Sequence, residues 1–129
     1  MKLEEILTKP EISEIKKQYE GEDKIIYLSR NSSLLEILAI NYFNGYHVSQ
    51  IVVGKGWKDK LDWVRDNYET VLKLKGFNPY QTAKILYGKE WYEKIQWIEN
   101  KYNPSNNNPE QVRKAMVKKN WKEDLGYAA

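Results

Sequence analysis

Lysines recur at regular intervals in this sequence, and their amines are the groups with the clearest potential for binding chemistry. Lys55 and Lys89 each follow a short apolar segment, and Lys60 and Lys94 follow them after the same interval. Amines gathered in this way can neutralise phosphates without reading a base sequence. The candidate DNA-contacting residues are Lys55, Lys58, Lys60, Lys89, Tyr92, Lys94, Lys118, Lys119 and Lys122.

Catalytic and metal-binding chemistry is not indicated. His47 is the only histidine, and the chain has no cysteine, so a metal site with several convergent ligands has no obvious donors. The carboxylates are scattered, and no nucleophile triad, P-loop or dinucleotide-binding glycine pattern is present. The sequence therefore predicts a protein that is not an enzyme and needs no cofactor or metal, with His47 at a solvent-facing helix position.

An internal repeat is the strongest pattern in the chain. Residues 76–102 match residues 42–68 at an offset of 34, so that Trp91 falls on Trp57, and they match residues 108–125 in part at an offset of 30. A period of this length indicates one supersecondary unit used several times.

Each repeat opens with a short predicted helix. Asn44, Asn78 and Asn108 stand where a helix N-cap is favoured, and a proline follows the second and third of them. Gly54 and Gly88 end the first two helices. The apolar positions follow the i, i+3, i+4 pattern of a buried helix face. These positions are Val48, Ile51 and Val52, then Thr82, Ile85 and Leu86, then Val112, Ala115 and Met116.

A second helix is predicted to begin near Trp57 and again near Trp91. The first meets no breaker before Lys75, which gives one helix of about 18 residues shared by two units. The second stops at Asn103, and the third unit is truncated at Leu125, with a frayed end over 126–129.

The tryptophans of these second helices fall into two groups. Trp57, Trp91 and Trp121 are predicted to be repeated core residues. Trp63 and Trp97 lie about 200° around the helix from the apolar stripe, at about 100° per residue. This leaves two alternatives open for them, which are packing between repeats and a surface for a partner.

The N-terminal region is predicted to be a helical leader. Helices over 2–9 and 11–19 are separated at Pro10, and Gly21 ends the second. Residues 24–28 suit a strand or a helix, and helix is favoured because no partner strand is visible. Residues 31–33 are predicted to cap a helix over 34–43. The expected organisation is one all-α domain over 1–129, with the leader over 1–33, repeat 1 over 34–68, repeat 2 over 69–103 and a partial repeat 3 over 104–129.

The stretch NGYHVSQIVVGKGWKDKLDWVRD resembles the helix-turn-helix of small transcription regulators and resolvase-like proteins. Tyr46, Gln50 and Ile51 match its short first helix, and Gly54 matches its turn. Leu61 and Val64 match the two buried positions of its recognition helix. The resemblance implies tandem helix-turn-helix-like repeats that share long helices and bind duplex DNA.

The distribution of charge supports DNA binding only in and just after the turns, where the lysines gather. Residues 37–129 carry fifteen basic residues and ten acids, whereas residues 1–36 carry six and eight. The exposed positions of the two second helices carry net charges of −1 and −2, and these acids would repel a phosphate backbone. Two function hypotheses follow. The first is a small non-enzymatic DNA-binding protein, a regulator or DNA-organising factor of a mobile element or virus. The alternative is an α-helical structural or adaptor protein that binds a partner or self-assembles through its Trp and Tyr surfaces.

The expected location is the cytoplasm. The first twenty residues contain acids where a signal peptide needs an apolar run, and no apolar stretch approaches the length of a membrane span.

Overall fold

The protein is all-α over the residues that the computed structural model describes, which are 3–33, 43–88 and 90–126. Within those ranges the chain forms helices and turns and no strand. The predicted fold class is therefore confirmed at the level of all-α. The first helices are α1 (Leu3–Ile6), α2 (Lys9–Lys16), α3 (Gly21–Arg30), α5 (Gly45–Ile51) and α6 (Trp57–Val71). After them come the 3-10 turn η1 (Lys73–Lys75), α7 (Pro79–Leu86), α8 (Trp91–Lys101), α9 (Pro109–Met116) and α10 (Trp121–Asp124).

The short helices α2, α5, α7 and α9 all begin with the same capping arrangement. In α7 the Asn78 side chain accepts a hydrogen bond from the Gln81 amide at 2.8 Å, and the Gln81 side chain accepts one from the Asn78 amide at 3.0 Å. Each partner thereby satisfies an amide that the helix cannot bond internally. The predicted caps Asn44, Asn78 and Asn108 are confirmed. Thr8 caps α2 in the same way.

The leader differs from its prediction at two residues. Pro10 does not separate two helices, because it lies in the first turn of α2, where its missing amide would have had no partner within the helix. Gly21 begins α3 instead of ending a helix, and a Cβ there would lie 2.2 Å from the Lys16 carbonyl oxygen. The predicted helix over 24–28 is confirmed within α3. Asn31 closes α3, and its side-chain amide donates to the Tyr27 carbonyl at 2.8 Å.

Two expectations lie outside the described residues or reach beyond them. The helix predicted over 34–43 falls almost entirely on 34–42, and the frayed end predicted over 126–129 is described only at Gly126.

The longer helices begin at the predicted tryptophans. α6 runs for 15 residues and is followed by η1, so the predicted continuous helix to Lys75 is interrupted after Val71. The chain then reverses at Gly76, whose φ of 93° is a conformation that favours glycine. α8 ends at Lys101, just before Asn103, as predicted.

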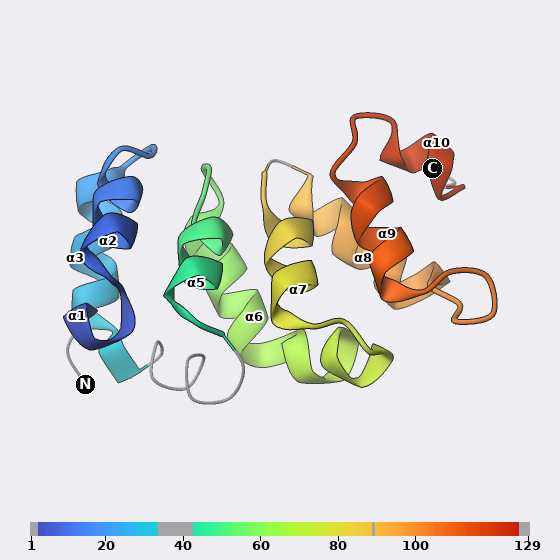
Figure 1. Cartoon of the computed structure of the whole chain (residues 1–129), viewed down its shortest axis with the longest axis horizontal. Helices are drawn as coiled ribbons and strands as arrows, with labels where there is room; N and C mark the ends of the chain where they lie inside the picture. Colours follow the sequence, from blue (N-terminus) through green and yellow to red (C-terminus); the bar gives the residue numbers. More distant parts are fainter. Residues whose placement is uncertain (1–2, 34–42, 89, 127–129) are drawn as a thin grey trace.

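The short helices stand side by side along the long axis of the molecule. Figure 1 shows α2, α5, α7 and α9 in a row from the N-terminal to the C-terminal side, with α3, α6 and α8 behind them. Direct packing joins α2 to α5, α5 to α7 and α7 to α9. Residues about one repeat apart in the sequence are therefore neighbours in space.

The buried faces of the short helices agree with the predicted pattern. Val48, Ile51 and Val52 are inaccessible at α5 and its C-terminal cap, as are Thr82, Ile85 and Leu86 in α7. In α9, Val112 and Met116 are buried, whereas Ala115 is only half-buried. The apolar periodicity therefore predicted the core-facing side of each short helix.

The repeated tryptophans join successive helix pairs. The Trp57 indole N–H donates to Glu20 Oε1 at 3.4 Å, and the Trp121 indole N–H donates to Glu90 Oε1 at 3.3 Å. Trp91 packs against Gly56, where a Cβ would lie 3.2 Å from the indole nitrogen. Glu20 stands directly before the long helix α3, Gly56 directly before α6 and Glu90 directly before α8. Each tryptophan therefore contacts the start of the long helix that precedes its own helix in the chain.

Candidate nucleic-acid interface

Basic residues dominate the short helices of the described repeats. α7 carries Lys84, and α9 carries Arg113 and Lys114. The one acid on α5, α7 and α9 is Glu110, which forms an ion pair with Arg113 at 2.7 Å. This pairing lowers the pKa of the Glu110 carboxyl, because Arg113 donates hydrogen bonds to its ionised form. These three helices together therefore carry a net positive charge.

The long helix α6 carries more acids than exposed bases, with Lys58 and Arg65 as its exposed cations. Asp59, Asp62, Asp66 and Glu69 all lie on α6. Arg65 lies among them, with ion pairs of 2.9 Å to Asp66 and 3.5 Å to Asp62. This arrangement is the acidic surface that the sequence predicts for the second helix of repeat 1, and it would repel a phosphate backbone.

Tyrosines alternate with cations across the short helices. Tyr46 and Tyr80 are 40% and 43% exposed, and the Lys84 amine lies 5.8 Å from the first ring centroid and 5.6 Å from the second. The Arg113 guanidinium lies 5.4 Å from the Tyr80 ring. Lys84 also donates to Gln50 Oε1 at 3.3 Å, which links α7 to α5. We call the surface formed by these residues and one neighbouring lysine the short-helix face, which consists of Tyr46, Gln50, Tyr80, Lys84, Arg113 and Lys114.

The sequence indicates lysines in and near the turns as candidates, whereas most of the short-helix face is not among them. Tyr46 and Tyr80 each occupy the second position of their helix and are 34 residues apart. Gln50 and Lys84 are separated by the same 34 residues. The repeat offset is the signal that could have found these residues, because side-by-side stacking brings equivalent positions of successive repeats together.

The predicted turn lysines are divided between exposed and paired positions. Lys55 is exposed, and its amine lies 5.7 Å from the Tyr19 ring centroid. Lys119 is exposed, and Lys118 is exposed with its amine 4.0 Å from Asp124. Lys122 forms ion pairs with both Glu90 and Glu93, and hydrogen bonds to these carboxylates raise its pKa. Lys89 lies outside the described residues.

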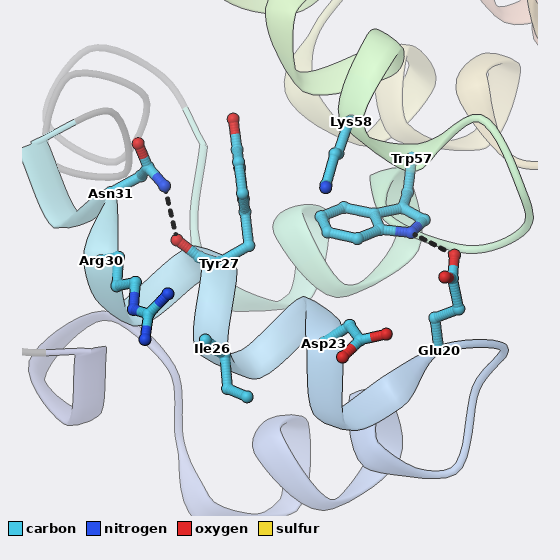
Figure 2. Close-up of a pocket in the computed structure, with 8 residues that line it drawn as sticks. All are labelled: Glu20, Asp23, Ile26, Tyr27, Arg30, Asn31, Trp57 and Lys58. Atoms are coloured by element: carbon cyan, nitrogen blue, oxygen red, sulfur yellow. Dashed lines mark hydrogen bonds between the residues drawn. The ribbon is translucent and has the colours of Figure 1, made fainter.

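Lys58 lies in a mixed-charge pocket away from the short-helix face. Figure 2 shows its amine beside the rings of Tyr27 and Trp57, and the distances to the two centroids are 5.4 and 5.3 Å. Glu20 and Asp23 also line this cavity of about 260 Å³. These carboxylates make the pocket a poor place for a phosphate.

Lys60 and Lys94 are buried, so the surface location predicted for them is wrong. Lys60 is 1% exposed, and its amine donates to the Val53 carbonyl at 2.6 Å. Lys94 is 8% exposed. Both are the fourth residue of their helix, and Lys24, the fourth residue of α3, is buried as well. The fourth position faces inward, so a lysine placed there is covered.

The three buried amines influence one another. Burial, together with the positive charges of Lys24 and Lys94, lowers the pKa of Lys60 to about 8. Burial also lowers the pKa of Lys24 and of Lys94, which Glu20 and Glu90 respectively counteract. We call Lys24, Lys60 and Lys94 the buried lysine row.

The partner-surface candidates do not form one exposed surface. Trp97 is 5% exposed, so its outward-facing alternative is wrong and packing within the chain is correct. Trp63 is half-buried against the core. Tyr92, which was predicted as a DNA-contacting residue, is 55% exposed, with its ring 5.6 Å from that of Trp91. α8 packs on α7 and is also contacted by Lys75 of η1 and Lys122 of α10, so a position away from its main apolar stripe is covered.

His47 has a local structural role instead of the predicted solvent-facing one. Its Nδ1 accepts a hydrogen bond from the Asn44 amide at 3.1 Å and completes the cap of α5. The side chain is half-buried, and this burial lowers the pKa of the imidazole. A neutral imidazole nitrogen is the form that accepts this bond.

The described part of the chain contains neither a metal-binding cluster nor a membrane-spanning helix, and the comparisons with known proteins found no match. Over residues 3–33, 43–88 and 90–126, no group of three or more His, Asp or Glu side chains is arranged to hold a metal ion. No helix in that part of the chain combines the length and the low polarity that crossing a bilayer requires. No protein-family model matches the chain, and neither the curated proteins nor the solved structures contain a match.

Proposed function

We propose that this protein is a small non-enzymatic nucleic-acid-binding protein that holds duplex DNA through phosphates. Its helix pairs act as tandem helix-turn-helix-like units, and they serve in regulation or in DNA organisation. The observation that carries the proposal is the separation of charge, with cations and tyrosines on the short-helix face and acids on α6.

The contacts follow from what the short-helix face offers. Lys84, Arg113 and Lys114 supply positive charge, and Tyr46 and Tyr80 supply hydroxyl donors and ring faces. Lysine and arginine contacts to phosphates give affinity with little base specificity. The acids of α6 keep that helix away from the DNA, so the long helix does not enter the major groove as a recognition helix would.

The side-by-side stack suits a linear polyanion. α5, α7 and α9 present equivalent positions one after another along the molecule, as Figure 1 shows. A backbone with a phosphate at regular intervals can therefore meet a cation or a tyrosine on each successive short helix. The exposed Lys55 and Lys119 extend this positive surface into the turns.

The proposal is tested by fluorescence anisotropy with a labelled random-sequence duplex at about 50 and 200 mM salt. The double variant Lys84→Met, Lys114→Met removes two cations from the short-helix face. It should weaken binding at least tenfold at the lower salt. The slope of log K against log salt should fall by about 0.9 for each phosphate that the variant no longer neutralises.

The matched control is Lys73→Met, Lys101→Met, which changes the net charge equally but lies on η1 and at the end of α8. It should change affinity less than threefold. Equal weakening in the two double variants would contradict binding through the short-helix face, because only net charge would then matter. Failure of the wild-type protein to bind any duplex at the lower salt would refute the proposal.

A further inference from the structure

A cavity of about 360 Å³ lies where three successive helix pairs meet. Its walls come from Gln50 on α5, Lys84 on α7, Tyr87 after α7, Lys94 on α8 and Val117 after α9. Two lysines line it, and no carboxylate is among these lining residues. The volume falls in the range of small-ligand pockets. The lining therefore favours an anion.

Lys94 differs from the other members of the buried lysine row in what its amine contacts. The Lys24 amine donates to Gln18 Oε1 at 3.1 Å, and the Lys60 amine donates to the Val53 carbonyl at 2.6 Å. Among the described residues, no oxygen accepts a hydrogen bond from the Lys94 amine, whose described contact is the Trp121 ring at 6.0 Å. The Lys94 amine is not enclosed by the protein, because the described side-chain atoms that are buried without a partner belong to Tyr68, Thr82 and Trp97. It is therefore open to the cavity that it lines, where an anionic oxygen can accept its hydrogen bonds.

The neighbouring groups leave Lys94 available to such a ligand. Glu90 is the acid that acts on Lys94, but its carboxylate already accepts hydrogen bonds from Lys122 and from the Trp121 indole. These bonds lower the pKa of Glu90, whose charge acts on Lys94 only through space and without a hydrogen bond to its amine. Lys84 uses one N–H on Gln50, which leaves two N–H donors for a ligand.

We propose that this cavity is a phosphate subsite in which Lys94 and Lys84 hold a phosphate group of the nucleic-acid backbone. The phosphate oxygens accept hydrogen bonds from the two amines, and Gln50 offers a side-chain amide at the same wall. Tyr87 and Val117, 47% and 54% exposed, line the mouth where the sugar would lie. This inference rests on the proposed function, because it assigns one phosphate position beside the short-helix face.

The subsite is tested by NMR titration of backbone amides with inorganic phosphate and separately with the duplex. Amides of Tyr87, Lys94 and Val117 should shift with both probes and saturate. Lys94→Met should weaken phosphate binding at least tenfold. Lys60→Met is the matched control, because it removes a buried amine from the same helix position outside the cavity lining. It should change phosphate affinity less than threefold.

The two probes separate this inference from the proposed function. If the duplex binds but the cavity amides do not shift and Lys94→Met has no effect, the subsite is wrong and the proposed function stands. If inorganic phosphate binds the cavity and the duplex does not, the site serves free phosphate and the nucleic-acid assignment is overturned. Lys84→Met provides a second variant at the surface, and it too should weaken phosphate binding if the subsite is correct.

Discussion

The buried amine of Lys60 should make the stability of this protein depend on pH in the alkaline range. The folded-state pKa of Lys60 is lowered from 10.5 to about 8. Burial is the main cause, and the charges of Lys24 and Lys94 add to it. Between pH 8 and 10.5 the unfolded chain therefore holds a proton on this amine that the folded protein does not.

The sign and size of the effect follow from proton linkage. Stability rises with pH wherever the unfolded state binds more protons. Protonation of the Lys60 amine therefore destabilises the folded protein fully below about pH 8, and this destabilisation disappears as the pH approaches 10.5. A shift from 10.5 to about 8, at about 1.4 kcal/mol per unit, corresponds to about 3 kcal/mol. The free energy of unfolding should gain about that amount from this one residue.

The assay compares urea unfolding of the wild-type protein and of Lys60→Met from about pH 7 to about pH 10.5. Methionine retains a long apolar side chain but cannot be charged, so the variant lacks this proton-linked penalty. The difference in unfolding free energy between the two proteins should change by about 3 kcal/mol across the range.

Lys58→Met is the matched control, because Lys58 lies on the same helix and is exposed. Its stability should run parallel to that of the wild-type protein as the pH rises. Parallel curves for wild type and Lys60→Met would refute the reasoning, because they would show that the Lys60 amine has an ordinary pKa in the folded state.

Two further predictions concern packing and caps. Trp121→Ala should lower the free energy of unfolding by about 3–5 kcal/mol, because the indole is 1% exposed, while Lys119→Ala should stay within about 0.5 kcal/mol in the same urea melt. Asn78→Ala should cost about 1 kcal/mol by leaving the Gln81 amide without its cap. Asn106→Ala, in an exposed loop, should leave the thermal midpoint unchanged, and an equal loss of stability in both Asn variants would contradict the capping role.

Much of the fold could be predicted because the signals are local. An asparagine followed by proline, as at Asn78 and Asn108, fixes a helix start through short-range hydrogen bonds. Apolar residues at i, i+3 and i+4 then identify the buried face. The same local logic failed at Thr8, because Pro10 suggests a break when it is read without the cap that precedes it.

The candidate site was harder to predict because it depends on which helices become neighbours. Lysine is rarely buried, so its type alone places Lys60 and Lys94 on the surface. Their burial follows from the inward-facing fourth position of α6 and α8. Trp97 is covered for a related reason, since stacking surrounds its helix on more than one side.

The row of short helices also has a consequence for how the chain folds. The packing of α2 on α5, α5 on α7 and α7 on α9 joins segments that are close in the sequence. Each of these contacts spans about one repeat and none has to join the two ends of the chain, so the sequence separation stays moderate, which favours faster folding than the pairing of distant segments. In stacked repeats, folding can begin at any unit and spread to its neighbours. The pair formed by α7 and α8, with a neighbour on either side, can therefore serve as a starting point from which order extends toward both ends of the chain.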